Sequence, residues 1–378
     1  MKIVLKEIKP IELEFGGPAR FTDPKIGLKE AGPFDMRFGP AQLKEVKLAI
    51  VGTKEMNQKA AFWIERCKGF IPTAMKNFHQ YPDFEGFETI FRSTLNTNAI
   101  WTYEISDELL KKALAFGDEN RFDAVLDLYN EGIVRMSNIE NNKPNIILCT
   151  IPDSVFEACH HIERKLSPKE KETYKKIASV NKYTNQLSLF DNNEEESEED
   201  LLYRDFRRAL KSKAIISKIP IQIGTNRLFI DMKDNQDAAT RAWHSSVALY
   251  YKAGGIPWRL KNTLLDTCFV GITFHHIKTN QRSVVKSCLA QAFSSDGEGF
   301  ALRGGDIPYN PKMGRIVHLS EQQSYGLGLK IVEEYAYRTG VSPQRIVLHK
   351  TSFFNEDEEY GFRAAFSSIP VVELINLL

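Results

Sequence analysis

Four basic and amide side chains between residues 204 and 252 have the composition of a phosphate-binding site. Arg207 and Lys211 are four residues apart, so on a helix their side chains lie on one face and can converge on one point. Gln222 and Lys252 follow, and the fold can bring them to the same point. Arg offers a planar fork to two phosphate oxygens, Lys offers a compact charge, and Gln adds a neutral donor. These four residues are the candidate site for a terminal phosphate.

The same basic face has a second interpretation. Arg204 and Arg208 extend it, and we treat them as additional candidate contacts to a nucleic acid. Leu202, Phe206 and Leu210 form the opposite, apolar side of the helical pattern. A surface helix whose charged face meets only water has this pattern too, so spacing alone does not separate the two readings.

Three predicted elements must position these side chains. The helical pattern that begins near Leu202 runs into a short β-rich segment at 219–223, which Pro220 opens. A second helix is predicted over 236–252. It ends at Ala253-Gly254-Gly255, because two glycines with Pro257 beyond them form a strong helix stop.

The composition is that of an ordinary globular chain with room for two domains. Of its 378 residues, 42% are hydrophobic and 26% are charged. The start is charged too early for a signal peptide, and no apolar run approaches the roughly 18 residues of a membrane span. The odd number of cysteines, without CxxC spacing, favours free thiols in a reducing compartment and no zinc site. We therefore expect a cytoplasmic protein that does not bind membranes. The cysteines are Cys67, Cys149, Cys159, Cys268 and Cys288.

The net charge of +1 hides an uneven distribution. Residues 191–200 hold seven acids and no base, and removing them leaves a net charge of +8 on the rest of the chain. Between 201 and 230, seven Lys or Arg residues face only Asp205. A binding site for a polyanion depends on such a local field and not on the overall charge.

The first half of the chain has the pattern of an α/β unit after an extended segment at 1–40. Gly52 follows the first strand of that unit without a GxGxxG motif, so we assign it to a plain turn. The polar stretch 167–200 is predicted to be a mobile insertion. The predicted strands are 3–8, 47–52, 88–92, 99–105 and 144–151, and the predicted helices are 58–67, 107–115, 121–136 and 155–166, the last capped by Asp153 or Ser154.

After Pro257 the pattern is three successive strands, a helix, a strand, a helix and a strand, as at the start of an RNase H-like fold. The predicted strands are 268–274, 283–293, 299–303, 345–350 and 370–375, and the predicted helices are 320–339 and 356–366.

Two pairs of adjacent histidines do not suggest a metal. His160 and His161 are predicted on a helix, where neighbours point about 100° apart. His275 and His276 are predicted on a strand, where neighbours face opposite sides.

Several of these stretches resemble a known family. Arg207, Lys211, Gln222 and the run 251–255 (Tyr-Lys-Ala-Gly-Gly) resemble the pocket of the MID domain of Argonaute proteins, which holds the 5′ phosphate of a guide strand. The stretches 15–35 and 252–258 are similar to short prokaryotic Argonautes, which consist of MID and PIWI domains only.

The resemblance implies an α/β fold of two domains. A Rossmann-like MID domain would cover 41–258, with the acidic insertion at 167–200, after the extended segment 1–40. An RNase H-like PIWI domain, incomplete at its C-terminus, would cover 259–378. Two positions depart from the family. Arg207 stands where many members stack an aromatic ring on the first base, and Ala248 stands where many carry a second lysine.

The resemblance also implies that the catalytic site of the PIWI domain is lost. RNase H-like nucleases hold two Mg²⁺ ions with carboxylates at strand ends, which hydroxyl groups cannot replace. At the two aspartate positions of slicing relatives this chain has Thr273 and Thr351, so we expect no catalytic residues and no catalytic metal. Nearby acids fit turns and a helix start. They are Asp296, Glu298, Asp306, Glu356, Asp357 and Glu358.

The expected function is that of a guide-binding subunit in prokaryotic defence. By resemblance, the chain would hold a small guide RNA, pair it with complementary single-stranded DNA and activate a partner effector. That partner would carry an APAZ segment with a TIR, sirtuin-like or nuclease domain. Mg²⁺ at the guide 5′ phosphate is the one cofactor left open. Two alternatives remain, namely an active Mg²⁺-dependent guided endonuclease and a Rossmann-like nucleotide-binding protein unrelated to guides.

Overall fold

The computed structural model describes residues 10–159, 161–165, 201–261, 266–278, 283–294, 299–303 and 317–377, without the side chains of 119, 161–165, 201–204, 275–278, 283–289 and 303. Several sequence predictions lie outside this described part of the chain. They are the strand at 3–8, the insertion at 167–200, the side chains of both histidine pairs and the acids Asp296, Glu298 and Asp306.

The chain divides into two compact units. The first contains Met1–Ile162 and Arg204–Lys261, and the second contains Glu163–Tyr203 and Asn262–Leu378. Every residue of the candidate phosphate site belongs to the first unit.

A four-stranded parallel sheet forms the centre of the first unit, in the order β4-β3-β5-β8. The central strands β3 and β5 are apolar almost throughout, which is typical of parallel strands covered on both faces. The strands are β3 (Glu45–Thr53), β4 (Thr94–Ile105), β5 (Ile146–Thr150) and β8 (Ile221–Gly224).

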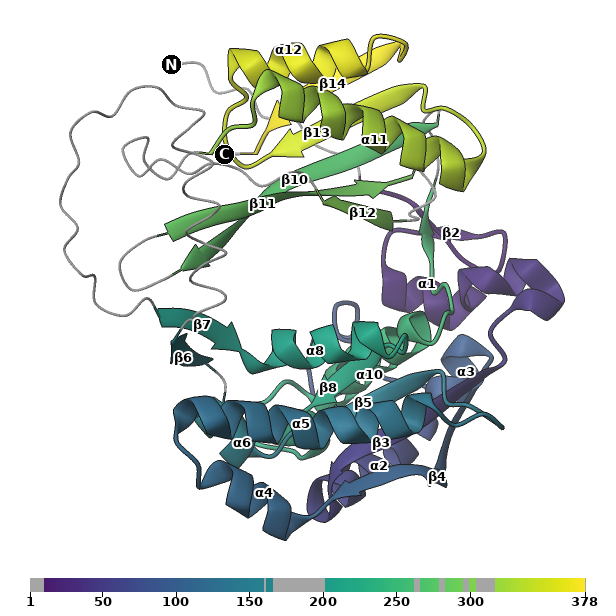
Figure 1. Cartoon of the computed structure of the whole chain (residues 1–378). Helices are drawn as coiled ribbons and strands as arrows, with labels where there is room; N and C mark the ends of the chain where they lie inside the picture. The colour runs from purple at the N-terminus through teal and green to yellow at the C-terminus, as the bar shows by residue number, and fades with distance from the viewer. Residues whose placement is uncertain are drawn as a thin grey trace, which may run out of the picture. The chain divides into compact units, whose positions relative to one another are not determined.

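Helices cover both faces of this sheet. Alternate residues of β3 point to opposite sides, so that Leu48 and Ile50 join one core while Ala49 and Val51 join the other. The first core includes α2 (Lys54–Lys68), α3 (Phe87–Phe91), α9 (Asn226–Phe229) and α10 (Ala238–Lys252). The second includes α4 (Asp107–Leu114), α5 (Asp118–Ser137), α6 (Asp153–Cys159) and α8 (Phe206–Ile216), with α5 and α8 side by side in Figure 1.

The segment 10–40 is more ordered than its sequence predicts. It contains α1 (Pro24–Ala31) and the 3-10 helix η1 (Phe34–Ala41), and a small antiparallel sheet joins β1 (Leu13–Glu14) to β2 (Arg20–Phe21) and β9 (Arg259–Leu260). The prediction of an extended segment was therefore wrong over α1. The missed signal is Asp23 followed by Pro24, because the Asp23 carboxylate caps the helix and proline suits its first position.

Three other predicted elements need correction. The predicted strand 88–92 is the helix α3, whose buried Phe87, Ile90 and Phe91 follow helical and not alternating spacing. The predicted helix 155–166 ends at Cys159 and is followed by β6 (His161–Lys165). Leu202 and Arg204 lie in β7 (Leu201–Asp205), so α8 begins only at Phe206, where the Asp205 carboxylate caps it. The strand β7 pairs with β6.

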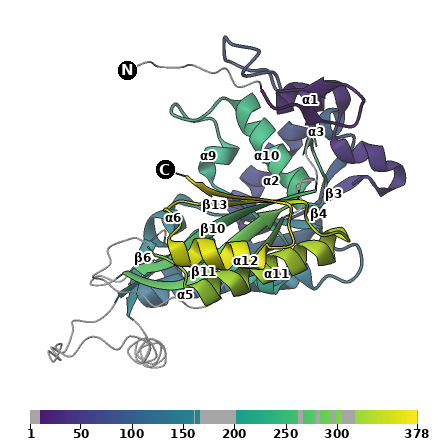
Figure 2. The same cartoon turned by 90° about the horizontal axis from the view of Figure 1, so that it is seen from above.

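The second unit contains a five-stranded sheet in the order β12-β11-β10-β13-β14. The strands β10, β11 and β12 are antiparallel, whereas β13 and β14 are parallel to β10, and α11 packs against α12 over the sheet (Figure 2). This is the RNase H-like order that the sequence predicts. The elements are β10 (Thr267–Lys278), β11 (Ser283–Phe293), β12 (Gly299–Arg303), α11 (Glu321–Thr339), β13 (Arg345–Lys350), α12 (Glu356–Ala365) and β14 (Val371–Asn376).

Among the described helices, none combines the length and the apolar composition that crossing a lipid bilayer requires.

Candidate phosphate-binding site

The site is built where the end of α10 meets the edge strand β8. Lys252 is the last residue of α10, and its half-buried ammonium group donates hydrogen bonds to the Ile221 carbonyl oxygen at 2.8 Å and to Gln222 Oε1 at 2.7 Å. The Gln222 amide nitrogen donates to the Ile223 carbonyl oxygen at 3.2 Å. These bonds fix two of the four candidate side chains against each other.

The other two candidates lie close enough to Lys252 to act on its charge. Burial lowers the pKa of Lys252, and the positive charges of Lys211 and Arg207 lower that pKa further. Both side chains come from α8 and are exposed to solvent. The fold therefore brings Arg207, Lys211, Gln222 and Lys252 together, as their types and spacing suggested.

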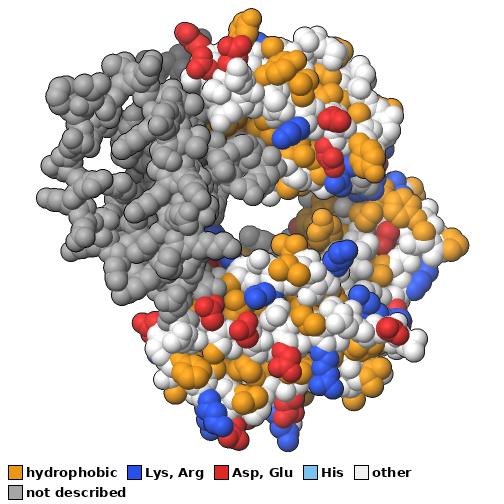
Figure 3. Space-filling model, viewed as in Figure 1, with side chains coloured by type: hydrophobic (Ala, Val, Ile, Leu, Met, Phe, Trp, Pro, Cys, Tyr) orange, Lys and Arg blue, Asp and Glu red, His pale blue; other side chains and the backbone are white. Residues whose placement is uncertain are grey.

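This group of three cations lacks acidic neighbours in the described part of the chain. No carboxylate there lies within ion-pair distance of Arg207, Lys211 or Lys252. The buried thiol of Cys149 offers no compensating charge at neutral pH, because burial raises its pKa to about 12. By contrast, acidic and basic side chains are interspersed over α4 and α5 (Figure 3). Like charges held together without a counter-ion favour the binding of an anion.

The two additional candidates do not join this group. The side chain of Arg204 lies outside the described residues. Arg208 is exposed, and its backbone N–H donates to Asp205 in the cap of α8. Successive residues on a helix point about 100° apart, so Arg208 projects in a different direction from Arg207. A role in contacting nucleic acid stays a prediction for both.

A cavity of about 420 Å³ opens beside Gln222. Its walls are the end of β8, the segment 225–237 and the first half of α10. We call this segment the loop at 225–237, although it includes the short helix α9. The sequence analysis missed this wall, although ligands of parallel α/β sheets bind at loops after the carboxyl ends of strands. The polar residues among those that line it are Gln222, Thr225, Arg227, Asp234, Asn235, Gln236, Arg241, His244 and Ser245.

A second, more apolar cavity of about 500 Å³ lies against another part of α10. Ala248 is part of its wall together with Val247, Tyr251 and Trp258. This alanine therefore contributes apolar surface to the cavity.

Thr273 lies on β10, and Thr351 directly follows the last residue of the neighbouring strand β13. Ile272 of β10 is in register with Lys350 of β13, and Thr273 and Thr351 each follow by one residue. Both threonines are exposed. That these two hydroxyl groups stand in for catalytic carboxylates stays a prediction from the sequence.

Lys350 itself is buried beside these positions. Its ammonium group lies 2.5 Å and 2.6 Å from the two carboxylate oxygens of the buried Glu358, and the rings of Phe274 and Phe354 lie 5.3 and 5.4 Å from it. His318 Nδ1 is 2.8 Å from the same carboxylate. Glu358, which the sequence analysis assigned to a helix start, thus has its charge neutralised by a lysine.

Comparisons with known proteins identify the fold. No family model and no curated protein matches the chain. Among solved structures, the chain is similar to Clostridium butyricum Argonaute bound to a guide DNA and a 19-mer target DNA. The TM-score is 0.51 with 14% sequence identity, over 98% of this chain and 39% of that protein. Marinitoga piezophila Argonaute in complex with a 5′ OH guide RNA gives a TM-score of 0.48 with 12% identity, over 97% of this chain and 44% of that one.

The described architecture is an α/β fold with a Rossmann-like first unit and an RNase H-like second unit. This fold is similar to that of Clostridium butyricum Argonaute. The chain spans about two fifths of the length of the solved Argonautes it matches. At this level of identity the similarity is one of fold.

Proposed function

We propose that this chain binds the 5′ end of a guide nucleic acid and holds its terminal phosphate with Arg207, Lys211, Gln222 and Lys252. The observation that carries the proposal is that these side chains converge: Lys252 donates to Gln222 Oε1 at 2.7 Å, and Lys211 and Arg207 lie close enough to act on its charge. A phosphate dianion would neutralise this repulsion and accept charge-assisted hydrogen bonds from all three cations.

The cavity beside Gln222 is the proposed place of the terminal nucleoside. Gln222 belongs both to the phosphate site and to the wall of the cavity. A ligand whose phosphate contacts Gln222 therefore has a space of about 420 Å³ next to that phosphate. A nucleoside attached to that phosphate is the natural occupant, because it is polar at its edges and flat. Thr225, Gln236 and His244 can supply donors and acceptors to it.

We further propose that the guide is RNA, that it pairs with complementary single-stranded DNA, and that the chain acts as a sensor in prokaryotic defence. The base pairs, and not the protein, would then read the sequence. An effector with an APAZ segment would be its partner. The support for this part is the Argonaute-like fold and the motif resemblance, so co-purification from the native host with sequencing of the bound oligonucleotides is its test.

We propose that the chain does not cleave the target itself. Thr273 and Thr351 supply hydroxyl groups where paired carboxylates would be needed to hold two Mg²⁺ ions. The test is incubation of the guide-loaded chain with labelled complementary DNA and Mg²⁺. Cleavage that is lost in Asp296→Ala or Asp306→Ala would overturn this proposal in favour of a guided endonuclease.

The experiment that tests the central proposal compares guides that differ only at their 5′ end. We expect the chain to bind a 5′-phosphorylated RNA of about 20 nucleotides more tightly than the same RNA with a 5′ hydroxyl. Since each charge-assisted bond contributes about 1.5–3 kcal/mol, the difference should be at least tenfold. Equal affinities would contradict the proposal. Tight binding of a mononucleotide without any preference for oligonucleotides would favour the nucleotide-binding alternative.

A further inference from the structure

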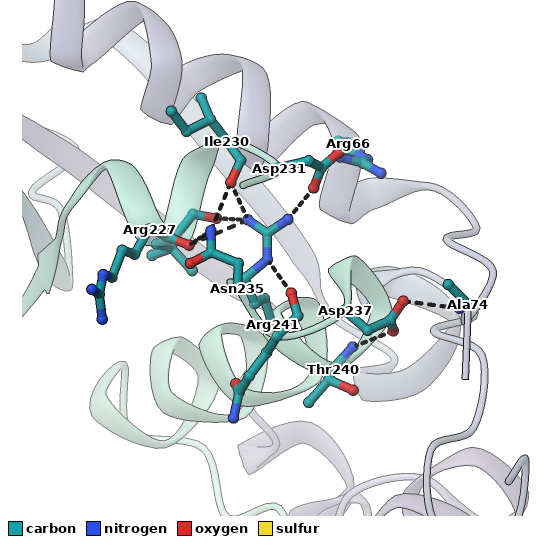
Figure 4. Close-up of polar contacts among 11 residues, drawn as sticks. Arg66, Ala74, Arg227, Ile230, Asp231, Asn235, Asp237, Thr240 and Arg241 are labelled. Carbon is teal, nitrogen blue, oxygen red and sulfur yellow. Dashed lines mark hydrogen bonds and ion pairs between the residues drawn. The ribbon is translucent and has the colours of Figure 1, made fainter. Parts of the chain in front are cut away.

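A buried arginine makes hydrogen bonds to several carbonyl oxygens of the loop at 225–237. Arg241 lies in the first turn of α10, and only 6% of its side chain is exposed. Its guanidinium group donates hydrogen bonds back into the loop, as Figure 4 shows. The acceptors are the carbonyl oxygens of Gln236 at 3.1 Å, Ile230 at 3.1 Å, Arg227 at 3.4 Å and, closest, Leu228.

Further contacts fix the same loop. Arg241 also pairs with the Asp231 carboxylate, which takes a second guanidinium from Arg66 of α2 at 3.1 Å. The Asn235 side-chain amide donates to the carbonyl oxygens of Arg227 and Ile230, each at 3.0 Å. Arg241 stacks over the buried Trp63 ring at 4.8 Å, which supports the guanidinium from the core side.

This arrangement has a direct effect on the cavity beside Gln222. Four loop carbonyls point toward Arg241, so they are satisfied inside the protein and the loop keeps its shape without a ligand. A preformed wall avoids the entropic cost of ordering a loop when the ligand binds. Because those carbonyls already accept bonds from Arg241, we expect a base to be recognised by side chains of the wall, such as Gln236 and His244.

We propose that Arg241 is a positioning residue that preforms the pocket for the terminal nucleoside of the guide. This inference rests on the proposed function, because it assigns the cavity to the nucleoside whose phosphate the cation group holds. Arg241 is also part of the cavity wall, but only 6% of its side chain is exposed, so it acts mainly through the loop, and it is not one of the four residues of the phosphate site. Its loss should therefore affect recognition of the nucleoside and leave recognition of the phosphate in place.

The test uses the full chain and three RNAs of one sequence. The first carries a 5′ phosphate, the second a 5′ hydroxyl, and the third a 5′ phosphate on an abasic first residue. In the unchanged protein, removal of the first base should weaken binding by about tenfold, the usual size of one base contact. In Arg241→Met, removal of that base should change the affinity less than about twofold, while the ratio of affinities for the 5′-phosphate and 5′-hydroxyl RNAs is kept.

Arg66→Met is the matched control. It removes the other partner of Asp231 but leaves the bonds to the loop carbonyls. Removal of the first base should therefore weaken binding by about as much in this variant as in the unchanged protein. If Arg66→Met and Arg241→Met behave alike, the ion pair with Asp231 and not the carbonyl bonds would be responsible, and the proposal would be wrong. Should Arg241→Met fail to fold, Arg241→Lys decides, because one ammonium group keeps the charge but cannot reach all four carbonyls.

The outcomes separate the two proposals. If the unchanged protein binds the 5′-phosphate and 5′-hydroxyl RNAs equally well, the proposed function is wrong. A preserved phosphate preference with an unchanged response to the missing base in the Arg241 variants would remove only the role of Arg241. If the unchanged protein binds the abasic RNA as tightly as the RNA with its first base, the role of Arg241 is also wrong. A variant that is merely unstable would lose affinity for all three RNAs by the same factor.

Discussion

The ammonium group of Lys252 lies 2.7 Å from Oε1 of Gln222, which joins the end of α10 to the edge strand β8. The contact offsets part of the cost of placing this cation in a half-buried position, where burial first and then the charges of Lys211 and Arg207 lower its pKa. A cation that is fixed in this way is already in position to bind an anion, and little side-chain freedom remains to be lost on binding.

Lys211→Ala should weaken binding of a 5′-phosphorylated guide by about 1.5–3 kcal/mol, the contribution of a charge-assisted hydrogen bond. The affinity for the 5′-hydroxyl guide should hardly change, because Lys211 would contact only the phosphate. Fluorescence anisotropy with both guides measures the difference.

Lys213→Ala is the control for this variant. Lys213 lies on the same helix and carries the same charge, but its ammonium group is 3.9 Å from Asp127. Lys213→Ala should lower the affinity for both guides equally and only slightly. Equal losses for both guides in Lys211→Ala would remove Lys211 from the phosphate site.

The affinity for the phosphorylated guide should depend on pH through Lys252. The pKa of Lys252 is lowered by burial and by Lys211 and Arg207, so the free protein gives up this proton at a lower pH than an ordinary lysine does. Binding needs the protonated form, and it should therefore weaken as pH rises through the lowered pKa, with uptake of a proton. Below about pH 6 the phosphate takes up its own second proton, and the affinity should fall again.

Lys252→Arg tests this assignment. A guanidinium group stays protonated over the whole range, so the fall in affinity at high pH should disappear while the fall at low pH stays. Titration calorimetry in two buffers with different ionisation heats measures the proton uptake directly. A high-pH limb that persists in Lys252→Arg would assign the dependence to another group.

Mg²⁺ should not be required for binding of the phosphate. Arg207, Lys211 and Lys252 supply three positive charges to a group that carries about two negative ones, so its charge is neutralised by side chains alone. Replacing Mg²⁺ by EDTA at constant ionic strength should change the affinity less than about threefold. A loss of tenfold or more, restored by Mg²⁺, would place a metal ion at the guide end.

Lys350→Met should destabilise the second unit by about 3–5 kcal/mol, because it leaves the carboxylate of Glu358 buried without its counter-ion. The double variant Lys350→Met with Glu358→Gln should recover much of the loss, since it removes the uncompensated charge. Urea unfolding followed by circular dichroism measures both variants.

Arg363→Met provides the comparison, because Arg363 lies on α12, the helix that also carries Glu358. It breaks an ion pair with Glu359 in which both side chains are about half exposed, and it should change stability by at most about 0.5 kcal/mol. The preference for a 5′ phosphate should be unaffected in all three variants, because the phosphate site belongs to the first unit. A loss for Arg363→Met as large as that for Lys350→Met would contradict the buried-charge argument.

The fold was predictable where hydrophobic spacing is continuous. The run around β5 and the strands β10 to β14 were predicted correctly, because a buried strand must be apolar along its length and bounded by turns. The short helices α1, α3 and α9 were missed. A helix of four to eight residues depends on its caps and on contacts with the rest of the fold more than on its own periodic pattern.

By itself, the sequence determined the chemistry that is available. It placed Arg207 and Lys211 one helical turn apart, and it supplied the amide of Gln222 and the charge of Lys252. Only the tertiary structure decided that Lys252 meets Gln222, 30 residues away along the chain, and that Arg241 turns inward to hold the loop at 225–237. Helical spacing is a local property of the backbone, whereas these contacts depend on how α10 packs against β8 and its loop, which no local pattern specifies.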